Sequence, residues 1–223
     1  ISDVVRAQMR LFDRLGIKEA YAVVGGSLGG MQALCFAIEF PNFAKRVVML
    51  ATTYATKAWA IAFNKIAIEG IVKDPNFKGG YYDKDDIAAN GLTGMALGRM
   101  AGHISFLSPS TMDKKFGRKY VETDGLYELL GRFEVDRYME YNGNNFPKRF
   151  DPLSYLYVVK MMNNFDCTRH YGSLNEALML TKARLTFIAF SGDILFPPNL
   201  MLEMHEALIQ IGQGHRSEYI CID

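Results

Sequence analysis

The sequence has few of the features that mark secreted, membrane-spanning or nucleic-acid-binding proteins. Only three of its 223 residues are cysteines, and Cys35, Cys167 and Cys221 are scattered without metal-ligand spacing. Such cysteine usage is typical of a reducing compartment. No apolar run is long enough for a transmembrane span, and no stretch resembles a signal peptide. The formal net charge is only +1, which gives no electrostatic reason to expect nucleic acid or an anionic membrane as partner.

Internal repeats and low-complexity linkers are also missing. What remains is the composition of an ordinary globular protein, 49% hydrophobic and 22% charged, with enough chain for a substantial core in one or two domains. We therefore expect a cytoplasmic, soluble protein.

A glycine-rich stretch, VVGGSLGGMQAL at residues 23–34, carries the clearest chemical signal. Gly25, Ser27 and Gly29 fit the G-x-S-x-G pattern, in which a strand turns sharply into a helix and lifts the serine hydroxyl above the sheet. Glycines suit this turn because it forces strained backbone angles and close packing. A P-loop would need lysine after Gly30, and a dinucleotide fingerprint would need glycine where Ser27 stands. A tight turn with an incidental serine remains the structural alternative.

The segments around this motif alternate between helical and strand patterns. Apolar residues recur at helical spacing before the motif, a short apolar run leads into it, and a helical run followed by a β-rich run comes after it. These segments are 2–16, 19–25, 28–40 and 45–52. The order predicts an α/β fold with parallel strands.

The middle of the chain changes character from about Tyr54 to about Asn175. Helical stretches at 58–72, 91–107 and 126–142 replace the alternation and are separated by turn residues. Their many aromatic residues and methionines indicate a packed core or interface, and a lid or a dimer contact is compatible with both.

We therefore divide the chain into an α/β core, made of residues 1–53 and 176–223, and a helical lid at 54–175.

A second candidate site residue follows the point where strand pattern resumes. Residues 186–190, TFIAF, read as a buried strand, and Asp193 stands just past its carboxyl end, where sheets of this type place reactive groups. In α/β-hydrolases the acid of the triad follows the nucleophile along the chain, so Asp193 is a candidate for it. Its alternative role is turn formation, or capping of the helix that Pro197 and Pro198 open.

Several segments together resemble one known family, the homoserine O-acetyltransferases, an acyltransferase branch of the α/β-hydrolase superfamily. In chain order they are VVGGSLGGMQAL, IAFNKIAIEGIVKDPNFKGGYY, GHISFLS, FGR, FEVDRYMEYNG, RFDPLSYLY and SGDILFPP. The resemblance implies an α/β-hydrolase fold with a parallel sheet and a helical lid. It also implies transfer of an acetyl group from acetyl-CoA to the hydroxyl of L-homoserine in methionine biosynthesis. Acetyl-CoA would be a substrate, and no bound cofactor or metal is expected. The family's lids meet in a homodimer.

The resemblance also assigns roles to individual residues. Ser27 would attack the thioester and hold the acetyl group, while Asp193 would orient the histidine that acts as base. The backbone N–H of Leu28 would supply one oxyanion-hole donor. Arg99 matches a lid arginine that binds the carboxylate of homoserine, a pairing suited to the guanidinium fork. Phe106 stands where the family usually has a tyrosine.

The catalytic histidine is not found among the four in the sequence. The family's histidine follows the last strand, whereas His205 and His215 precede it, and His103 and His170 lie in the insertion. We nominate none of them. The loop that normally carries the second oxyanion donor is absent too. We therefore expect the chain to be truncated at both ends, with base and second donor outside it.

Alternative functions remain open at this point. A close relative using succinyl-CoA or serine would differ in only a few pocket residues. A noncatalytic fragment or scaffold would account for the missing histidine. An esterase would need the same triad, but it would give no reason for the family-like lid.

Overall fold

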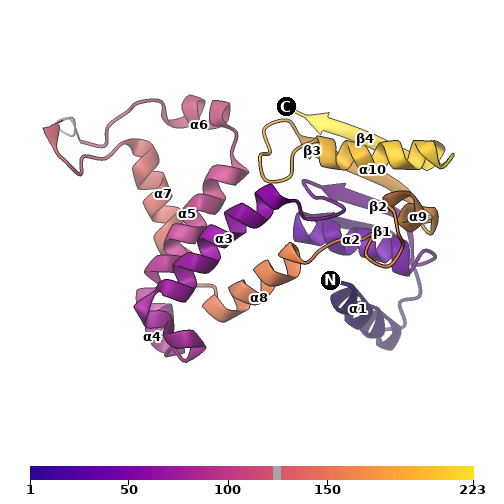
Figure 1. The fold of residues 1–223 in the computed structure, drawn as a ribbon, viewed down its shortest axis with the longest axis horizontal. Helices are drawn as coiled ribbons and strands as arrows, with labels where there is room; N and C mark the ends of the chain where they lie inside the picture. Colours follow the sequence, from indigo (N-terminus) through magenta and orange to yellow (C-terminus); the bar gives the residue numbers. More distant parts are fainter. Residues whose placement is uncertain (123–126) are drawn as a thin grey trace. The chain divides into compact units, whose positions relative to one another are not determined.

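The computed structural model describes residues 1–122 and 127–223, and these form two compact units (Figure 1). Residues 1–57 and 161–223 make the first unit, and residues 58–160 make the second.

The first unit alternates helices and strands in the expected order, which confirms the α/β fold class. Its elements are α1 (Ser2–Arg14), β1 (Ala20–Gly26), α2 (Leu28–Glu39), β2 (Ala44–Leu50), α9 (Leu174–Met179), β3 (Arg184–Phe190), α10 (Asn199–Gln210), the 3-10 helix η3 (Gly214–Arg216) and β4 (Ser217–Ile222).

The four strands form one parallel sheet in the order β1-β2-β3-β4. Gly26 pairs with Leu50, Leu50 with Ile188, and Phe190 with Ile222. Because all strands run the same way, their carboxyl ends lie together at one edge. This edge is where open α/β sheets place their ligands.

One face of the sheet is buried and the other is only partly covered. Val47, Met49, Leu185 and Phe187 have no exposed surface, whereas Ile188, on the opposite face, is half-buried. Right-handed crossovers between neighbouring parallel strands put α2 and α10 on the same face. The alternation of buried and less buried residues along β3 follows from this one-sided cover.

The segments entering and leaving the insertion pair with each other inside the first unit. The Thr56 N–H donates to the carbonyl oxygen of Phe165 at 2.9 Å, and the Cys167 N–H donates to that of Tyr54 at the same distance. The Thr56 hydroxyl donates to the carbonyl oxygen of Met162. The second unit therefore spans 58–160, a shorter range than the lid expected from the sequence.

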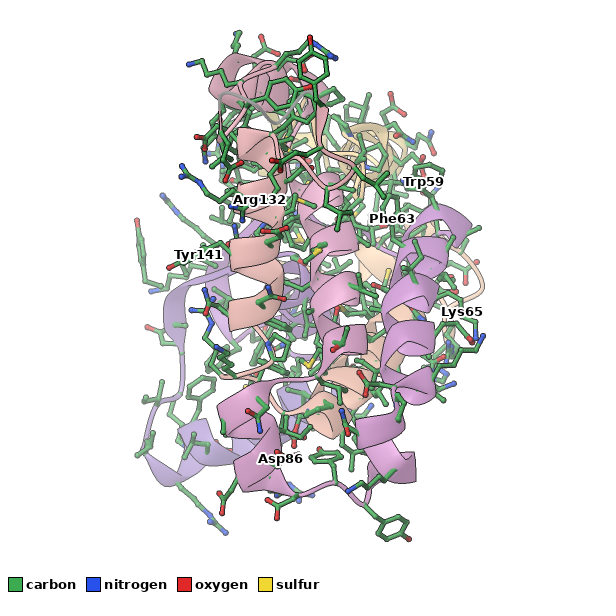
Figure 2. The ribbon with its side chains drawn as sticks, turned by 90° about the vertical axis from the view of Figure 1, so that its left-hand side faces the viewer. Trp59, Phe63, Lys65, Asp86, Arg132 and Tyr141 are labelled. Atoms are coloured by element: carbon green, nitrogen blue, oxygen red, sulfur yellow. The ribbon has the colours of Figure 1, made fainter. Side chains whose placement is uncertain are left out.

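The second unit is helical. Its elements are α3 (Ala58–Lys73), the 3-10 helix η1 (Pro75–Gly80), α4 (Lys84–Asn90), α5 (Thr93–Phe106), α6 (Pro109–Phe116), α7 (Glu134–Asn145) and most of α8 (Pro152–Asn163). Helix α5 packs against both α3 and α7 and lies between them (Figure 2). In the described parts of the chain, no helix has the length and apolarity needed to cross a membrane.

One helix begins later than its sequence pattern predicts. The expected stretch was 126–142, but α7 starts at Glu134, and Leu126 lies outside the described residues. The Asp136 carboxylate accepts the backbone N–H of Phe133 at 2.8 Å. This bond satisfies a free donor at the helix start and fixes it there.

The helical unit depends on a close approach between α3 and α5. Its core cluster comprises Ile71, Phe77, Ile87, Leu92 and Met95. Beside it, a Cβ atom on Gly94 would lie 1.8 Å from the carbonyl oxygen of Gly70. The Gly94 N–H also donates to the buried Asp74 carboxylate at 2.8 Å. A side chain at position 94 would force the two helices apart.

We expect Gly94→Ala to destabilise the protein. Overpacking against backbone should lower the free energy of unfolding by roughly 1 to 3 kcal/mol, measured by urea titration followed by circular dichroism. Gly102→Ala on the same helix is the matched control, because a Cβ there meets only the Phe106 ring, at 3.4 Å. The control should be neutral or more stable by up to about 1 kcal/mol, since alanine favours helix. Equal stabilities of the two variants would contradict the packing argument.

Candidate functional site

Ser27 occupies a strained turn between β1 and α2. Its φ is +52° and its ψ is −118°, a region that residues with a side chain rarely adopt and that costs of order 1 to 3 kcal/mol. The residue is half-buried. The G-x-S-x-G pattern predicts a turn of this kind, and the structure has one at Ser27.

The glycines around Ser27 allow strand and helix to touch. A Cβ on Gly25 would lie 2.1 Å from the carbonyl oxygen of Gly29, and one on Gly30 would lie 2.6 Å from Cγ2 of Thr52. Gly29 itself has open space beside it. Gly30 and Thr52 therefore shape the turn as much as the motif residues do, although no local pattern singled them out.

The start of α2 places backbone N–H groups beside Ser27. Helix α2 starts at Leu28 with no side-chain cap, and the Ser27 carbonyl accepts the first helical bond, from the Met31 N–H at 3.1 Å. The N–H groups of a first helical turn have no partner within the helix and lie at the positive end of its dipole. Leu28 can therefore offer its N–H to an oxyanion formed next to Ser27.

Asp193 lies at the same edge of the sheet as Ser27. Ser27 follows β1 and Asp193 follows β3, and β2 lies between these parallel strands. One oxygen of the carboxylate, Oδ1, accepts the N–H groups of Leu195 and Phe196, each at 2.9 Å. Burial raises the pKa of Asp193, and the two N–H bonds only partly offset this effect. Asp193 therefore makes the expected turn and still has Oδ2 free of hydrogen bonds from the described residues.

Two of the four histidines lie toward the opposite edge. His215 is in η3, directly before β4, and the Nδ1 atom of His205 is 2.7 Å from Oγ of Ser217, the first residue of β4. Ser217 pairs with Leu185 near the start of β3. The strand between Ser217 and Ile222 is about 17 Å long at 3.3 Å per residue. His205 and His215 are thus roughly a strand length from the carboxyl edge.

The other two histidines have different surroundings. His170 lines a cavity of about 240 Å³ together with parts of α1, the C-terminal half of α2 and the 161–171 segment. His103 belongs to the second unit, where its Nδ1 atom is 3.3 Å from the Tyr138 hydroxyl. Burial, and then the charge of Arg99, lower the pKa of His103. The structure brings neither to Ser27 within a described unit.

The buried cysteines are poor candidates for a nucleophile. Cys35 and Cys167 line the same cavity as His170. Burial raises the pKa of Cys35 to about 11 and also raises that of Cys167. Thiols of this kind stay protonated near neutral pH and are unreactive.

Arg99 sits among aromatic rings in the second unit. Its guanidinium carbon is 4.5 Å from the centre of the Phe146 ring and 5.4 Å from that of Phe106. Burial lowers the pKa of Arg99, and Arg149 acts in the same direction while Tyr155 opposes it. No carboxylate pairs with it in the described ranges. A half-buried guanidinium without an anion is suited to receive one from a ligand.

The chain is similar to known sequences over nearly its whole length. The family model described as alpha/beta hydrolase fold matches residues 1–210. A homoserine O-acetyltransferase of Sulfurimonas autotrophica is 56% identical over 217 residues, and one of Nautilia profundicola is 50% identical over 212 residues. These alignments cover 97% and 95% of this chain, but the chain spans only 59% and 58% of the relatives' lengths.

Comparison with solved structures gives the same fold. A homoserine O-acetyltransferase from Bacillus anthracis aligns over 99% of this chain and 58% of its own, with a TM-score of 0.88 and 24% identity. Esterase E22 aligns over 98% of this chain and 58% of its own, with a TM-score of 0.83 and 27% identity. With the parallel sheet, the serine turn and the family match in agreement, the chain belongs to the alpha/beta hydrolase fold family.

Proposed function

We propose that the protein containing this chain is a homoserine O-acetyltransferase, which moves an acetyl group from acetyl-CoA to the hydroxyl of L-homoserine in methionine biosynthesis. One observation carries the proposal: identity of 50 to 56% with relatives of that name runs through 95 to 97% of the chain. It therefore includes the helical unit as well as the hydrolase sheet. A shared fold alone would not require similarity in the helices.

The chemistry we propose has two half-reactions. The Ser27 oxygen attacks the thioester carbonyl, the new C–O bond forms, the C–S bond breaks, and CoA leaves as a thiol with the proton that the base took from Ser27. The homoserine hydroxyl then attacks the acetyl-serine, gives its proton through the base to Ser27, and leaves as the ester. The Leu28 N–H stabilises the oxyanion in both steps, a contact worth on the order of 100 to 1000-fold in rate.

The base in this proposal is a histidine from outside residues 1–223, oriented by Asp193. The position of Asp193 at the carboxyl edge supports its role, as does its free Oδ2 atom within the described structure. The second oxyanion donor is likewise assigned outside this chain. His205 and His215 are disfavoured because they lie toward the amino edge.

We assign the carboxylate of homoserine to Arg99. The absence of an acidic partner in the described residues and the aromatic rings around the guanidinium support this role. Phe106 supplies a ring to Arg99 but no hydroxyl. Substrate contacts that a tyrosine would make must therefore come from other groups.

We also propose a homodimer formed through the helical unit, in the cytoplasm. On α3, Trp59 is 57% exposed and Ile66 is 52% exposed. Trp59 and Phe63 pack edge to face at 5.3 Å and lie on one side of the helical unit (Figure 2). An exposed apolar patch of this kind is typical of an interaction surface.

A hydrolase is the second candidate function. The likeness to esterase E22 favours it, because the same serine chemistry ends in hydrolysis when water replaces the acceptor hydroxyl. Donor and acceptor preferences separate the candidates. An acetyltransferase should prefer acetyl-CoA over succinyl-CoA in kcat/KM and homoserine over water and serine as acceptor.

We expect Ser27 to carry an acetyl group during turnover. Incubation of the full-length protein with acetyl-CoA alone should add one acetyl mass to the peptide that contains Ser27, as measured by mass spectrometry. Ser27→Ala should abolish this adduct. Ser191→Ala is the control, because this exposed serine follows β3 at the same edge and should leave the adduct in place. An adduct that persists in Ser27→Ala would disprove the nucleophile assignment.

We expect Asp193→Asn to stabilise the fold while removing activity. The pKa of Asp193 is raised in the folded state, so the folded protein binds a proton there more readily than the unfolded chain does. The stability that this protonation contributes is present below the unfolded pKa of Asp193 and is lost as pH rises through its folded pKa. The variant should therefore unfold at higher urea than the wild type at pH 7, and the difference should shrink toward about pH 4. Acetyl transfer should fall on the order of 10⁴-fold, as in comparable triads.

Asp151→Asn is the control of opposite sign. Burial alone would raise the pKa of Asp151, but hydrogen bonds from Tyr82 and Ser154 together outweigh it and lower that pKa. The stabilising contribution of Asp151 is therefore present above its unfolded pKa and is lost as pH falls through its folded pKa. This variant should lose stability at pH 7. If Asp193→Asn were the less stable of the two, or if it kept wild-type turnover, our account of Asp193 would be wrong.

We expect Arg99→Lys to impair only the second half-reaction. The variant keeps the charge but loses the two-pronged contact, which should cost about 2 kcal/mol or more, roughly 30-fold in kcat/KM for homoserine. The initial burst of CoA release without homoserine should keep its wild-type rate. Arg118→Lys is the matched control, since this exposed arginine lies over the Phe133 ring at 5.5 Å. Equal losses in both half-reactions would argue against carboxylate binding by Arg99.

A further inference from the structure

The end of β2 and the turn that follows it bind the backbone of Ser27, which directly follows the neighbouring strand β1. The Ser27 N–H donates to the carbonyl oxygen of Leu50 at 2.9 Å. The Thr52 hydroxyl donates to the carbonyl oxygen of Ser27 at 2.7 Å. Both polar backbone groups of Ser27 are therefore bound by residues on either side of Ala51.

Ala51 makes this double contact possible. Its φ is +43°, in the left-handed region that alanine rarely adopts and that costs about 1 kcal/mol or more. The turn is fixed from its other side, because the Ala51 N–H donates to the carbonyl oxygen of Ile188 on β3 at 3.0 Å. Two non-glycine residues with positive φ, Ser27 and Ala51, thus directly follow adjacent strands. The residues on either side of Ala51 provide the hydrogen bonds to Ser27.

Thr52 has no freedom to move away from Ser27. It is completely buried, and its Cγ2 and Cβ atoms lie so close to Gly30 that a Cβ there would be 2.6 to 2.7 Å from them. A β-branched side chain is already restricted at χ1. Packing against the first turn of α2 therefore holds the hydroxyl toward the Ser27 carbonyl.

We propose that Thr52 is a positioning residue for the nucleophile. By binding the Ser27 carbonyl and packing against Gly30, it fixes the serine hydroxyl relative to the Leu28 N–H at the start of α2. The proposal rests on the proposed function in one respect, namely that Ser27 is the nucleophile. Alignment matters because a displacement of about 1 Å at a reacting group costs on the order of 100-fold in rate.

The experiment measures the reactivity of Ser27 without either substrate. A fluorophosphonate is added to the full-length protein, so that the Ser27 oxygen bonds to phosphorus, fluoride leaves, and the hydroxyl proton passes to the base. Thr52→Val keeps the packing volume and removes the hydroxyl. Thr52→Ser keeps the hydroxyl. Thr181→Val is the matched control, because Thr181 is also buried and donates to a backbone carbonyl, that of Leu178 at 2.8 Å.

We expect Thr52→Val to slow labelling about tenfold or more, while Thr52→Ser stays close to the wild type. Steady-state kcat for acetyl transfer should fall in parallel in Thr52→Val, with KM for acetyl-CoA and homoserine unchanged. Thr181→Val should match the wild-type labelling rate even where its urea midpoint falls as far as that of Thr52→Val.

Each contrary result has a separate meaning. Labelling of Thr52→Val at the wild-type rate would overturn the role of Thr52 and leave Ser27 as nucleophile. Equal slowing in Thr181→Val would also overturn it, because general destabilisation would then explain the loss. A wild-type protein unlabelled at Ser27 would overturn the nucleophile assignment and the role of Thr52 with it.

Discussion

The backbone of Ser27 is the constraint on which the site depends. A serine at a φ of +52° is unfavourable by itself, so the surroundings must hold it there. They do so in three ways. Gly25 lets the start of the helix touch the end of the strand, and Gly30 leaves room for Thr52. The last residue of β2 and the turn after it bind the serine N–H and carbonyl. Removing any one of these contacts loosens a conformation that the chain would not adopt alone.

The parallel sheet brings the strained turn at Ser27 together with the turns that follow the neighbouring strands. Because β1, β2 and β3 run in the same direction, the serine turn, the Ala51 turn and the Asp193 turn all follow carboxyl ends and gather at one edge. The covered face of the sheet holds the strands in register through buried residues such as Val47 and Phe187. Packing beneath the sheet and chemistry at its edge are therefore linked, since a shift of one strand would separate the turns that meet there.

Periodicity and motif spacing could predict most of the first unit. Helix and strand patterns before and after Ser27 are local properties of the sequence, as are the positions of Ser27 and Asp193 after their strands. Non-local contacts could not be predicted in the same way. The position of Thr52 depends on its packing against Gly30. The limits of the helical unit follow from backbone pairing between Tyr54 and Cys167. Helix α7 begins where the Asp136 carboxylate binds the Phe133 N–H.

Strand direction also decides which histidines suit the proposed reaction. A base must reach the serine hydroxyl within hydrogen-bond distance, directly or through one water. His215 immediately precedes β4 and His205 is tied to Ser217 at its start, so both belong to the amino edge, while Ser27 and Asp193 belong to the carboxyl edge. No rotamer change spans a strand of about 17 Å. The proposed base must therefore reach the carboxyl edge of the sheet, where the Oδ2 atom of Asp193 accepts no hydrogen bond from the described residues and where neither His205 nor His215 lies.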